Sequence, residues 1–262
     1  MTFLLVAILA GLETQEPPIT LEKLEDLLFE CRVGVRGDAR TKTKAAEELS
    51  KVSDEFIPVL IRALGGTYPE RVARRIEEAE AKEGVAYRGE VGSLGIEHWV
   101  GEAIEKAGGR MVPALLESLQ SVPGPTATVA GLLGRIGDRR ANPALLKLLQ
   151  EKARGWHVRV VAANSLRQLK SREAVPHLIE TLEESTTSQF VDEMNRIANT
   201  LAKFTGQSFG LKLVPERKTL SKEGTIPAHY DLPSTAPERR AAVELWKQWW
   251  KESGPEFLKQ DK

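Results

Sequence analysis

The chain is poor in the residues that build disulfides and metal sites. Its 262 residues include one cysteine, Cys31, and four histidines. A single cysteine excludes an intrachain disulfide framework and a cysteine-cluster zinc site. No histidine lies within a helical turn of another, so a metal site would have to be assembled from distant parts of the chain. Cys31 has no partner in the sequence that would make it a nucleophile, and we expect it to be a small core residue.

Net charge and long apolar runs are also lacking. Lys and Arg total 37 and so do Asp and Glu, which argues against binding dominated by phosphate attraction, although local patches can still hold anions. No stretch approaches the roughly 20 apolar residues of a membrane-spanning helix. A phosphate-binding GxxxxGK[ST] loop, a GxSxG elbow and an HExxH zinc motif are all missing. We therefore predict no catalytic, metal-binding or cofactor-binding residue.

The N-terminal segment, residues 1–17, begins with an apolar run, MTFLLVAILAGL, and a polar stretch with prolines at positions 17 and 18 follows this run. The apolar run fits the core of an export signal, but no positive charge precedes it and its cleavage site is weak. A frayed first helix, or a start further upstream, explains it as well. Exported and cytoplasmic locations both stay open.

One sequence phrase recurs four times, beginning at Ala45, Val100, Val129 and Ala162. Each copy has two small or apolar residues, aliphatic residues three and six positions on, a turn, a proline and an aliphatic pair. A fifth half-copy, IANTLAKF, begins at Ile197. Repeats of this kind are typical of solenoids.

Each copy predicts two amphipathic helices. In the last full copy the two apolar stripes follow helical spacing. They are Ala163, Leu166 and Leu169, then Val175, Leu178, Ile179 and Leu182. Helices joined by about four residues pack antiparallel, and one pair cannot cover its own apolar faces, so copies stack. The sequence predicts an all-α solenoid of stacked antiparallel helix pairs.

LGRIGDRRANPALLKLL, from Leu133, and HVRVVAANSLRQLKSREAVPHLIETL, from His157, resemble the bacterial HEAT-repeat family. The likeness is to its short form, known from phycobilin-lyase subunits. It is strong over 128–206 and weaker at 44–64 and 100–119. It implies architecture more than function, and it implies that Asp138 in the turn and Arg159 before the alanine pair stabilise the stack. Asp138 is also placed to cap the following helix.

The predicted organisation has four parts. Residues 1–17 are the apolar segment, 18–206 the HEAT-like solenoid with an insertion at 66–98, 207–236 an irregular and partly extended loop, and 237–262 a tryptophan-rich helix and tail. The insertion begins with a charged, helix-favouring half and ends in a glycine-rich half. It is either a functional loop or a solvated excursion.

The two ends of the solenoid have their own apolar patterns. Thr20 is predicted to cap a helix over 20–30 with Leu21, Leu24 and Leu28 on one face. At the other end, Trp246, Trp249 and Trp250 crowd one helix face. They predict either a cap on the open end of the solenoid or a docking surface for another protein.

Two opposed charge blocks lie within the neutral total. From Arg135 to Arg172 there are ten basic and two acidic residues, and from Glu173 to Asn195 there are six acidic residues and no Lys or Arg. The basic block could hold an anionic partner, or the two blocks could pair with each other. The candidate anion-binding residues are Arg135, Arg139, Arg140, Lys152, Arg154 and Arg167. Trp156 and His157, in the predicted inter-repeat turn, are the first candidates for a partner-facing spot.

Three functional hypotheses follow. The first is a non-catalytic scaffold that binds a protein or peptide along the stacked helices. The second is nucleic-acid or polyanion binding through 135–172, which predicts steep salt dependence. The third is a lyase or glycosylase, as some HEAT-like relatives are, although the sequence shows no acid–base pair for it. The sequence predicts no particular oligomeric state.

Overall fold

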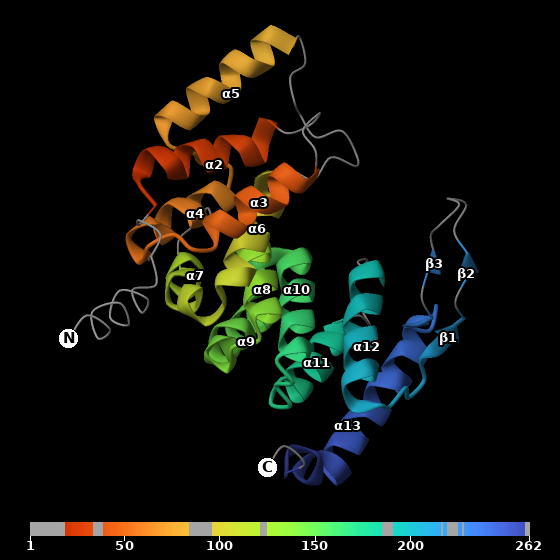
Figure 1. The fold of residues 1–262 in the computed structure, drawn as a ribbon. Coiled ribbons are helices and arrows are strands. Elements are labelled where there is room, and N and C mark those ends of the chain that lie inside the picture. Colours follow the sequence, from red (N-terminus) through yellow and green to blue (C-terminus); the bar gives the residue numbers. More distant parts are fainter. Residues whose placement is uncertain are drawn as a thin grey trace, which may run out of the picture. The chain divides into compact units, whose positions relative to one another are not determined.

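A computed structural model describes residues 19–33, 39–83, 96–120, 125–184, 191–215, 217–218, 225–226 and 228–259. The described chain is mostly helical, with helices packed in pairs in an arrangement consistent with an α-solenoid (Figure 1). The predicted fold class is confirmed. The chain divides into two compact units, Met1–Ala107 and Gly108–Lys262. The possible export signal and the glycine-rich half of the insertion, from 84 to 95, lie outside the described residues.

The first unit is built from α-helices around one apolar core. They are α2 (Leu21–Val33), α3 (Ala39–Leu49), α4 (Ile57–Leu64), α5 (Glu70–Glu83) and α6 (Ile96–Ala107), with a 3-10 turn, η1 (Asp54–Phe56). α2 packs against α3, α5 and α6, and α6 packs against α3 and α4. Leu24, Leu60 and Ile104 are fully buried in this core.

The buried face of α2 differs from the prediction in one residue. Thr20 caps the helix as expected, because its Oγ1 accepts from the Lys23 amide at 3.2 Å. Leu24 and Leu28 are buried, but Leu21 is 50% exposed. Side chains in a helix lean toward its N-terminus, so the side chain of the first helical residue projects past the helix end. Leu27 completes the buried face instead.

The front half of the insertion is a packed helix. Val72 and Ile76 of α5 are buried, and α5 lies against α2. Arg71 donates to Glu25 at 3.2 Å and Arg75 to Asp26 at 2.6 Å. This half of the insertion is therefore not a solvated excursion.

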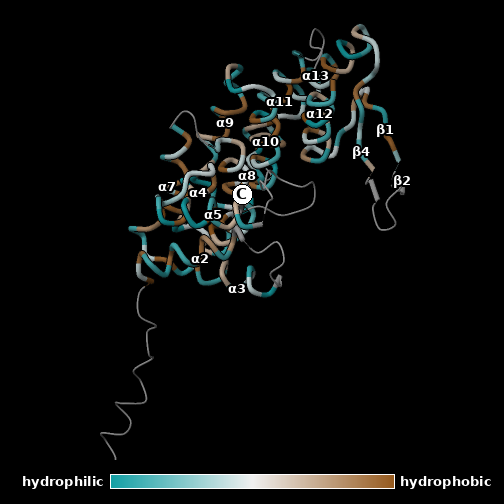
Figure 2. Tube along the Cα trace, turned by 90° about the horizontal axis from the view of Figure 1, so that it is seen from above, coloured by the Kyte–Doolittle hydropathy of each residue, from teal (hydrophilic) through white to brown (hydrophobic). Residues whose placement is uncertain are grey.

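The second unit consists of two rows of helices (Figure 2). One row contains α8 (Thr126–Ile136), α10 (Gly155–Gln168) and α12 (Val191–Thr205), and the other α9 (Asn142–Gln150), α11 (Ala174–Glu183) and α13 (Ala236–Lys259). α7 (Val112–Ser118) precedes them, and the 3-10 turns are η2 (Gly108–Met111), η3 (Arg139–Ala141) and η4 (Lys152–Arg154). All seven residues of the two predicted stripes are at most 4% exposed, so the predicted apolar faces are confirmed.

The repeated prolines begin the second helix of each pair. Pro58, Pro113 and Pro143 occupy one of the first two positions of α4, α7 and α9, and Pro176 is the third residue of α11. Amides in the first turn have no partner within the helix, so the missing proline N–H costs little there.

The segment predicted as an irregular, partly extended loop holds two short strand pairs. β1 (Lys212–Val214) pairs antiparallel with β4 (His229–Asp231), and β2 (Arg217–Lys218) with β3 (Thr225–Ile226). Strands of two or three residues are too short to leave a recognisable alternating pattern in the sequence.

The tryptophan helix α13 packs against α11. Trp246 is fully buried, and its ring meets the edge of Phe209 at 5.1 Å between ring centroids. Trp249 and Trp250 are half-buried and cluster with Phe257. This packing supports the capping role, which stays a prediction for the three tryptophans.

Candidate partner-binding site

The predicted partner-facing pair lies at the start of a helix and not in a turn. The turn between α9 and α10 is η4, and Gly155 ends it with a φ of 75°. Trp156 and His157 are the next two residues and belong to the first turn of α10. Trp156 is half-buried and His157 is exposed.

Arg159, one helical turn further on, joins three helices. Its side chain is only 3% exposed and stacks on the Trp156 ring at 4.1 Å. Its Nε donates to the Leu149 carbonyl at 2.8 Å, and Nη1 and Nη2 donate to the two oxygens of Glu184 at 3.1 and 3.0 Å. Nη2 also lies 3.4 Å from the Thr181 hydroxyl. Because each guanidinium nitrogen has an acceptor, this buried charge is compensated.

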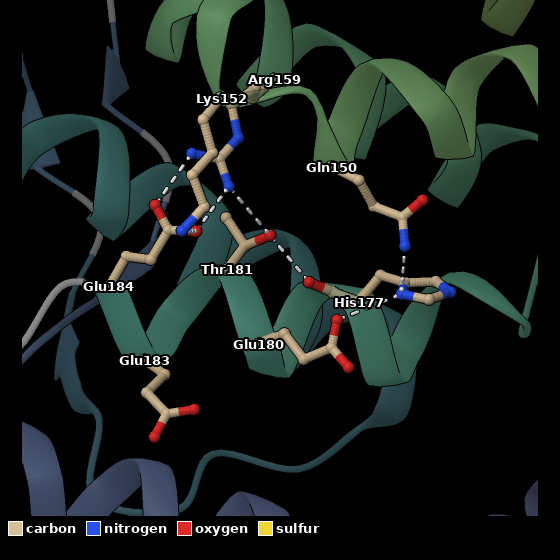
Figure 3. A pocket seen from close by; sticks show the side chains of 8 residues that line it. All are labelled: Gln150, Lys152, Arg159, His177, Glu180, Thr181, Glu183 and Glu184. Atoms are coloured by element: carbon tan, nitrogen blue, oxygen red, sulfur yellow. Dashed lines mark hydrogen bonds and ion pairs between the residues drawn. The ribbon is translucent and has the colours of Figure 1, made fainter.

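The two opposed charge blocks meet at Glu184. Lys152 lies 3.3 Å from the same carboxylate that Arg159 holds (Figure 3). Burial alone would raise the pKa of Glu184, but the hydrogen bonds and charges of Arg159 and Lys152 outweigh it and lower that pKa. The carboxylate is therefore kept ionised.

Two hollows open around this ion-pair cluster, and we call them the Arg159 hollows. Both are lined by Lys152, Arg159 and Glu184. The first has a volume of about 510 Å³ and extends to His177, whose Nδ1 lies 2.9 Å from the Gln150 amide (Figure 3). The second has a volume of about 550 Å³ and extends to Trp156, His157 and Glu193. Cations, carboxylates and one indole ring thus face the same opening.

The other basic candidates do not join these hollows. Because consecutive helices run antiparallel, the C-terminal ends of α8 and α10 lie at the opposite edge of the stack from η4. Four candidates belong to that opposite edge, namely Arg135, Arg139, Arg140 and Arg167. Arg154 is in η4 and is 3.2 Å from Glu151. The predicted basic surface is thus divided between two edges.

Asp138 caps the 3-10 turn η3 ahead of α9. Its Oδ1 accepts from the Arg140 backbone amide at 2.9 Å, and its Oδ2 accepts from Arg140 Nη2 at 2.6 Å. The side-chain hydrogen bond from Arg140 is the main cause that lowers the pKa of Asp138. Arg140 also donates to the Gly109 carbonyl at 2.8 Å, so a predicted anion-binding residue is engaged within the chain.

Sequence reasoning missed several residues of the hollows. Glu184 and Glu193 were counted only within the acidic block, and Gln150 and His177 were not singled out as lining residues. The prediction for Arg159 named a stabilising role but no acceptor. A buried arginine needs an acceptor on a neighbouring helix, and this requirement is the signal that could have pointed to Glu184. No comparable signal points to Gln150 or Glu193.

A comparison with protein families agrees with this fold. Residues 112–191 match the model of HEAT repeats. The match runs from the start of α7 to the first residue of α12, so it includes both Arg159 hollows apart from Glu193. A comparison with curated proteins gave no significant match. HEAT repeats generally mediate protein binding. No described helix is long and apolar enough to cross a membrane.

Proposed function

We propose that the protein is a non-catalytic scaffold that binds a protein or peptide partner, with the Arg159 hollows as the contact point. The observation that carries this proposal is the position of the hollows within the HEAT repeat region. They present a half-buried indole beside charges of both signs, a combination common at protein interfaces. Trp156 is the anchor residue of this surface, and His157 and Lys152 form its exposed rim.

The charge state of the hollows supports a binding role. A general acid needs a carboxyl group whose pKa is raised toward neutrality. The pKa of Glu184 is lowered instead, and Arg159 and Lys152 hold its carboxylate. Among the described residues, no group of three His, Cys, Asp or Glu side chains could hold a metal ion.

The test is capture of the partner with two variants that each place a glutamate at an exposed position. His157→Glu changes an exposed residue in the first turn of α10, where an acidic side chain suits the helix dipole, so folding is preserved. Lys147→Glu makes a charge reversal on α9, at an exposed residue that lines neither hollow. A partner identified by mass spectrometry is then titrated against each variant by calorimetry. We expect His157→Glu to weaken binding at least tenfold and Lys147→Glu to leave it unchanged.

Equal binding by both variants would contradict the assignment of the hollows. The same titration, repeated at rising salt, separates the polyanion alternative. Nucleic-acid binding requires log affinity to fall linearly with log salt concentration. A shallow salt response with a protein partner supports the scaffold.

A further inference from the structure

The side chain of Asn199, in α12, forms hydrogen bonds with the main chain of an extended segment of the same protein. Its Oδ1 accepts from the Tyr230 amide at 2.8 Å, and its Nδ2 donates back to the Tyr230 carbonyl. One turn earlier, Asn195 Oδ1 accepts from the Leu232 amide at 2.8 Å. Tyr230 lies in β4, opposite Leu213 of β1. The two carboxamides therefore bind the edge of β4 and the residue that follows it as a neighbouring strand would.

The spacing explains why this works. Residues four apart on a helix are separated by about 6 Å along its axis. Alternate residues of a strand, whose polar groups face one edge, are separated by about 6.8 Å. Two carboxamides at i and i+4 thus match residues j and j+2 of an extended chain. The contacts involve only the main chain of the bound segment, so they do not depend on its sequence.

The preceding helix of the same row carries two carboxamides with the same i, i+4 spacing, shifted by one helical turn. AANSL at 162–166 in α10 aligns with IANTL at 197–201 in α12, which places Asn164 at the position of Asn199. The position of Asn195 is held by the buried Val160, and the second carboxamide, Gln168, follows four residues after Asn164 at the position of Lys203. The side chains of Asn164 and Gln168 are both exposed. Asn164 Oδ1 accepts from Arg167 at 3.3 Å, while the described residues offer no acceptor to its Nδ2 and no partner to the Gln168 carboxamide. We call Asn164 and Gln168 the carboxamide pair of α10.

The residues around this pair are a glycine and two arginines. A Cβ on Gly134 of α8 would lie 2.5 Å from the Gln168 carboxamide, so α8 comes close to the pair without a side chain at that point. Arg135 follows Gly134 and is exposed, and Arg167 lies beside Asn164. No described strand packs on α10 as β4 packs on α12 (Figure 2).

We propose that the carboxamide pair of α10 binds an extended acidic peptide segment of a protein partner. Asn164 and Gln168 pair with its main chain, as Asn199 pairs with Tyr230, and Arg135 and Arg167 attract its carboxylates. That the partner is a protein is taken from the proposed function, and in this respect the inference rests on it. It assigns a surface different from the Arg159 hollows.

The probe is a fluorescein-labelled octapeptide of alternating Glu and Thr, titrated with the full chain by fluorescence anisotropy. Asn164→Leu and Gln168→Leu keep side-chain size but remove the hydrogen bonds, and each is expected to weaken binding about tenfold. Gln248→Leu is the matched control, because Gln248 is an exposed carboxamide on α13 whose described bond is to Glu252 in its own helix. Thermal melts of each variant confirm that it is folded.

A second peptide tests the main-chain contacts directly. It has the same sequence with alternate amide nitrogens methylated, so its charge is kept while N–H donors are removed. It is expected to bind at least tenfold more weakly, and an octapeptide of Lys and Thr is expected not to bind. Equal affinity for the methylated and unmethylated peptides, with no effect of Asn164→Leu, would overturn the proposal in favour of charge attraction alone.

Two further outcomes keep this inference separate from the proposed function. Loss of octapeptide binding in His157→Glu would place the peptide in the Arg159 hollows and overturn the assignment to α10. A thymidine oligonucleotide that competes with the octapeptide and binds Asn164→Leu as tightly as wild type would replace the peptide by nucleic acid. If the octapeptide fails to bind while the captured partner still depends on His157, this inference falls and the proposed function stands.

Discussion

Arg159 and Glu184 are 25 residues apart and form a two-point ion pair, with distances of 3.0 and 3.1 Å between guanidinium nitrogens and carboxylate oxygens. The arginine is on α10 and the glutamate directly follows α11, so the pair connects the two helices of one repeat. Glu184 also holds Lys152, the residue that begins η4. The basic and acidic blocks of the sequence therefore contact each other in the folded protein.

Replacing Arg159 by methionine is expected to destabilise the protein by about 2–4 kcal/mol. Removing one partner of a buried ion pair leaves the other without compensation, at a cost of about 3–5 kcal/mol, and the partial exposure of Glu184 reduces that cost. Lys152→Met is the control, because the lysine side chain is 74% exposed and surface ion pairs contribute about 0–1 kcal/mol. Urea unfolding followed by circular dichroism measures both variants. Equal losses would show that Arg159 has no special role.

The stability contributed by Glu184 is expected to disappear in acid. The pKa of Glu184 in the folded protein is below its ordinary value of 4.5, so the folded state favours the ionised form. The resulting stabilisation is fully present above pH 4.5 and is lost as the pH falls through the lower, folded-state pKa. Glu184→Gln cannot titrate. The free energies of unfolding of wild type and variant should therefore differ most near pH 6 and converge as the pH falls through the folded-state pKa of Glu184, as urea titrations at decreasing pH would show.

The sequence predicted the helical architecture because its information is local and repeated. Leu166 and Leu178 lie on apolar stripes whose period alone identifies a buried helix face, and several copies carry the same pattern. Pro143 and Pro176 mark helix starts for an equally local reason. The resemblance at 133–182 added the stacking order, which a single copy does not contain.

The candidate site was predicted only in part, because it depends on contacts between distant residues. Trp156 and His157 were selected, but Glu193, 37 residues after Trp156, lines the same hollow and no local pattern joins the two. The pairing of Asn199 with Tyr230 spans 31 residues and two kinds of secondary structure. Leu21 was wrongly predicted to lie on the buried face, because the helical period of a sequence does not show which residues the neighbouring helices leave exposed.

Trp246 is expected to be essential for folding of the C-terminal helix. It is fully buried against Phe209, and truncation of a buried tryptophan costs about 3–5 kcal/mol. Trp246→Phe retains most of the apolar surface and removes a buried indole N–H that has no hydrogen-bond partner among the described residues, so its cost should be smaller. Leu245→Ala is the control, since Leu245 is 46% exposed in the same helix. If Trp246→Ala and Leu245→Ala lower the free energy of unfolding equally, α13 is not a cap.

Cys31 is expected to be unreactive in the native protein. Burial raises the pKa of its thiol to about 12, and only the thiolate reacts readily with disulfide reagents. Dithionitrobenzoate at pH 8 should therefore label the native chain very slowly and the urea-unfolded chain within minutes. The rate of labelling at intermediate urea reports the opening of the first unit, because Cys31 lies in α2. Rapid stoichiometric labelling without denaturant would contradict the burial of this helix face.

Two glycines of α8 provide a matched pair for the close approach of α8 and α10. A Cβ on Gly134 would lie 2.6 Å from the Ser165 Cβ and 2.5 Å from Gln168 Oε1, whereas a Cβ on Gly131 would meet its nearest neighbours at 3.6 and 3.7 Å. Both residues are helical, so alanine gains up to about 1 kcal/mol of helix propensity at either position. At Gly134 the clash with Ser165 cannot be relieved by a flexible side-chain end and forces the helices apart, at a cost of about 1–3 kcal/mol.

We therefore expect Gly134→Ala to lower the melting temperature and Gly131→Ala to leave it unchanged or raise it. Ser165→Gly should rescue Gly134→Ala in part by removing the Cβ that the new methyl group meets. Failure of that rescue would mean that the loss arises elsewhere than at the contact between α8 and α10.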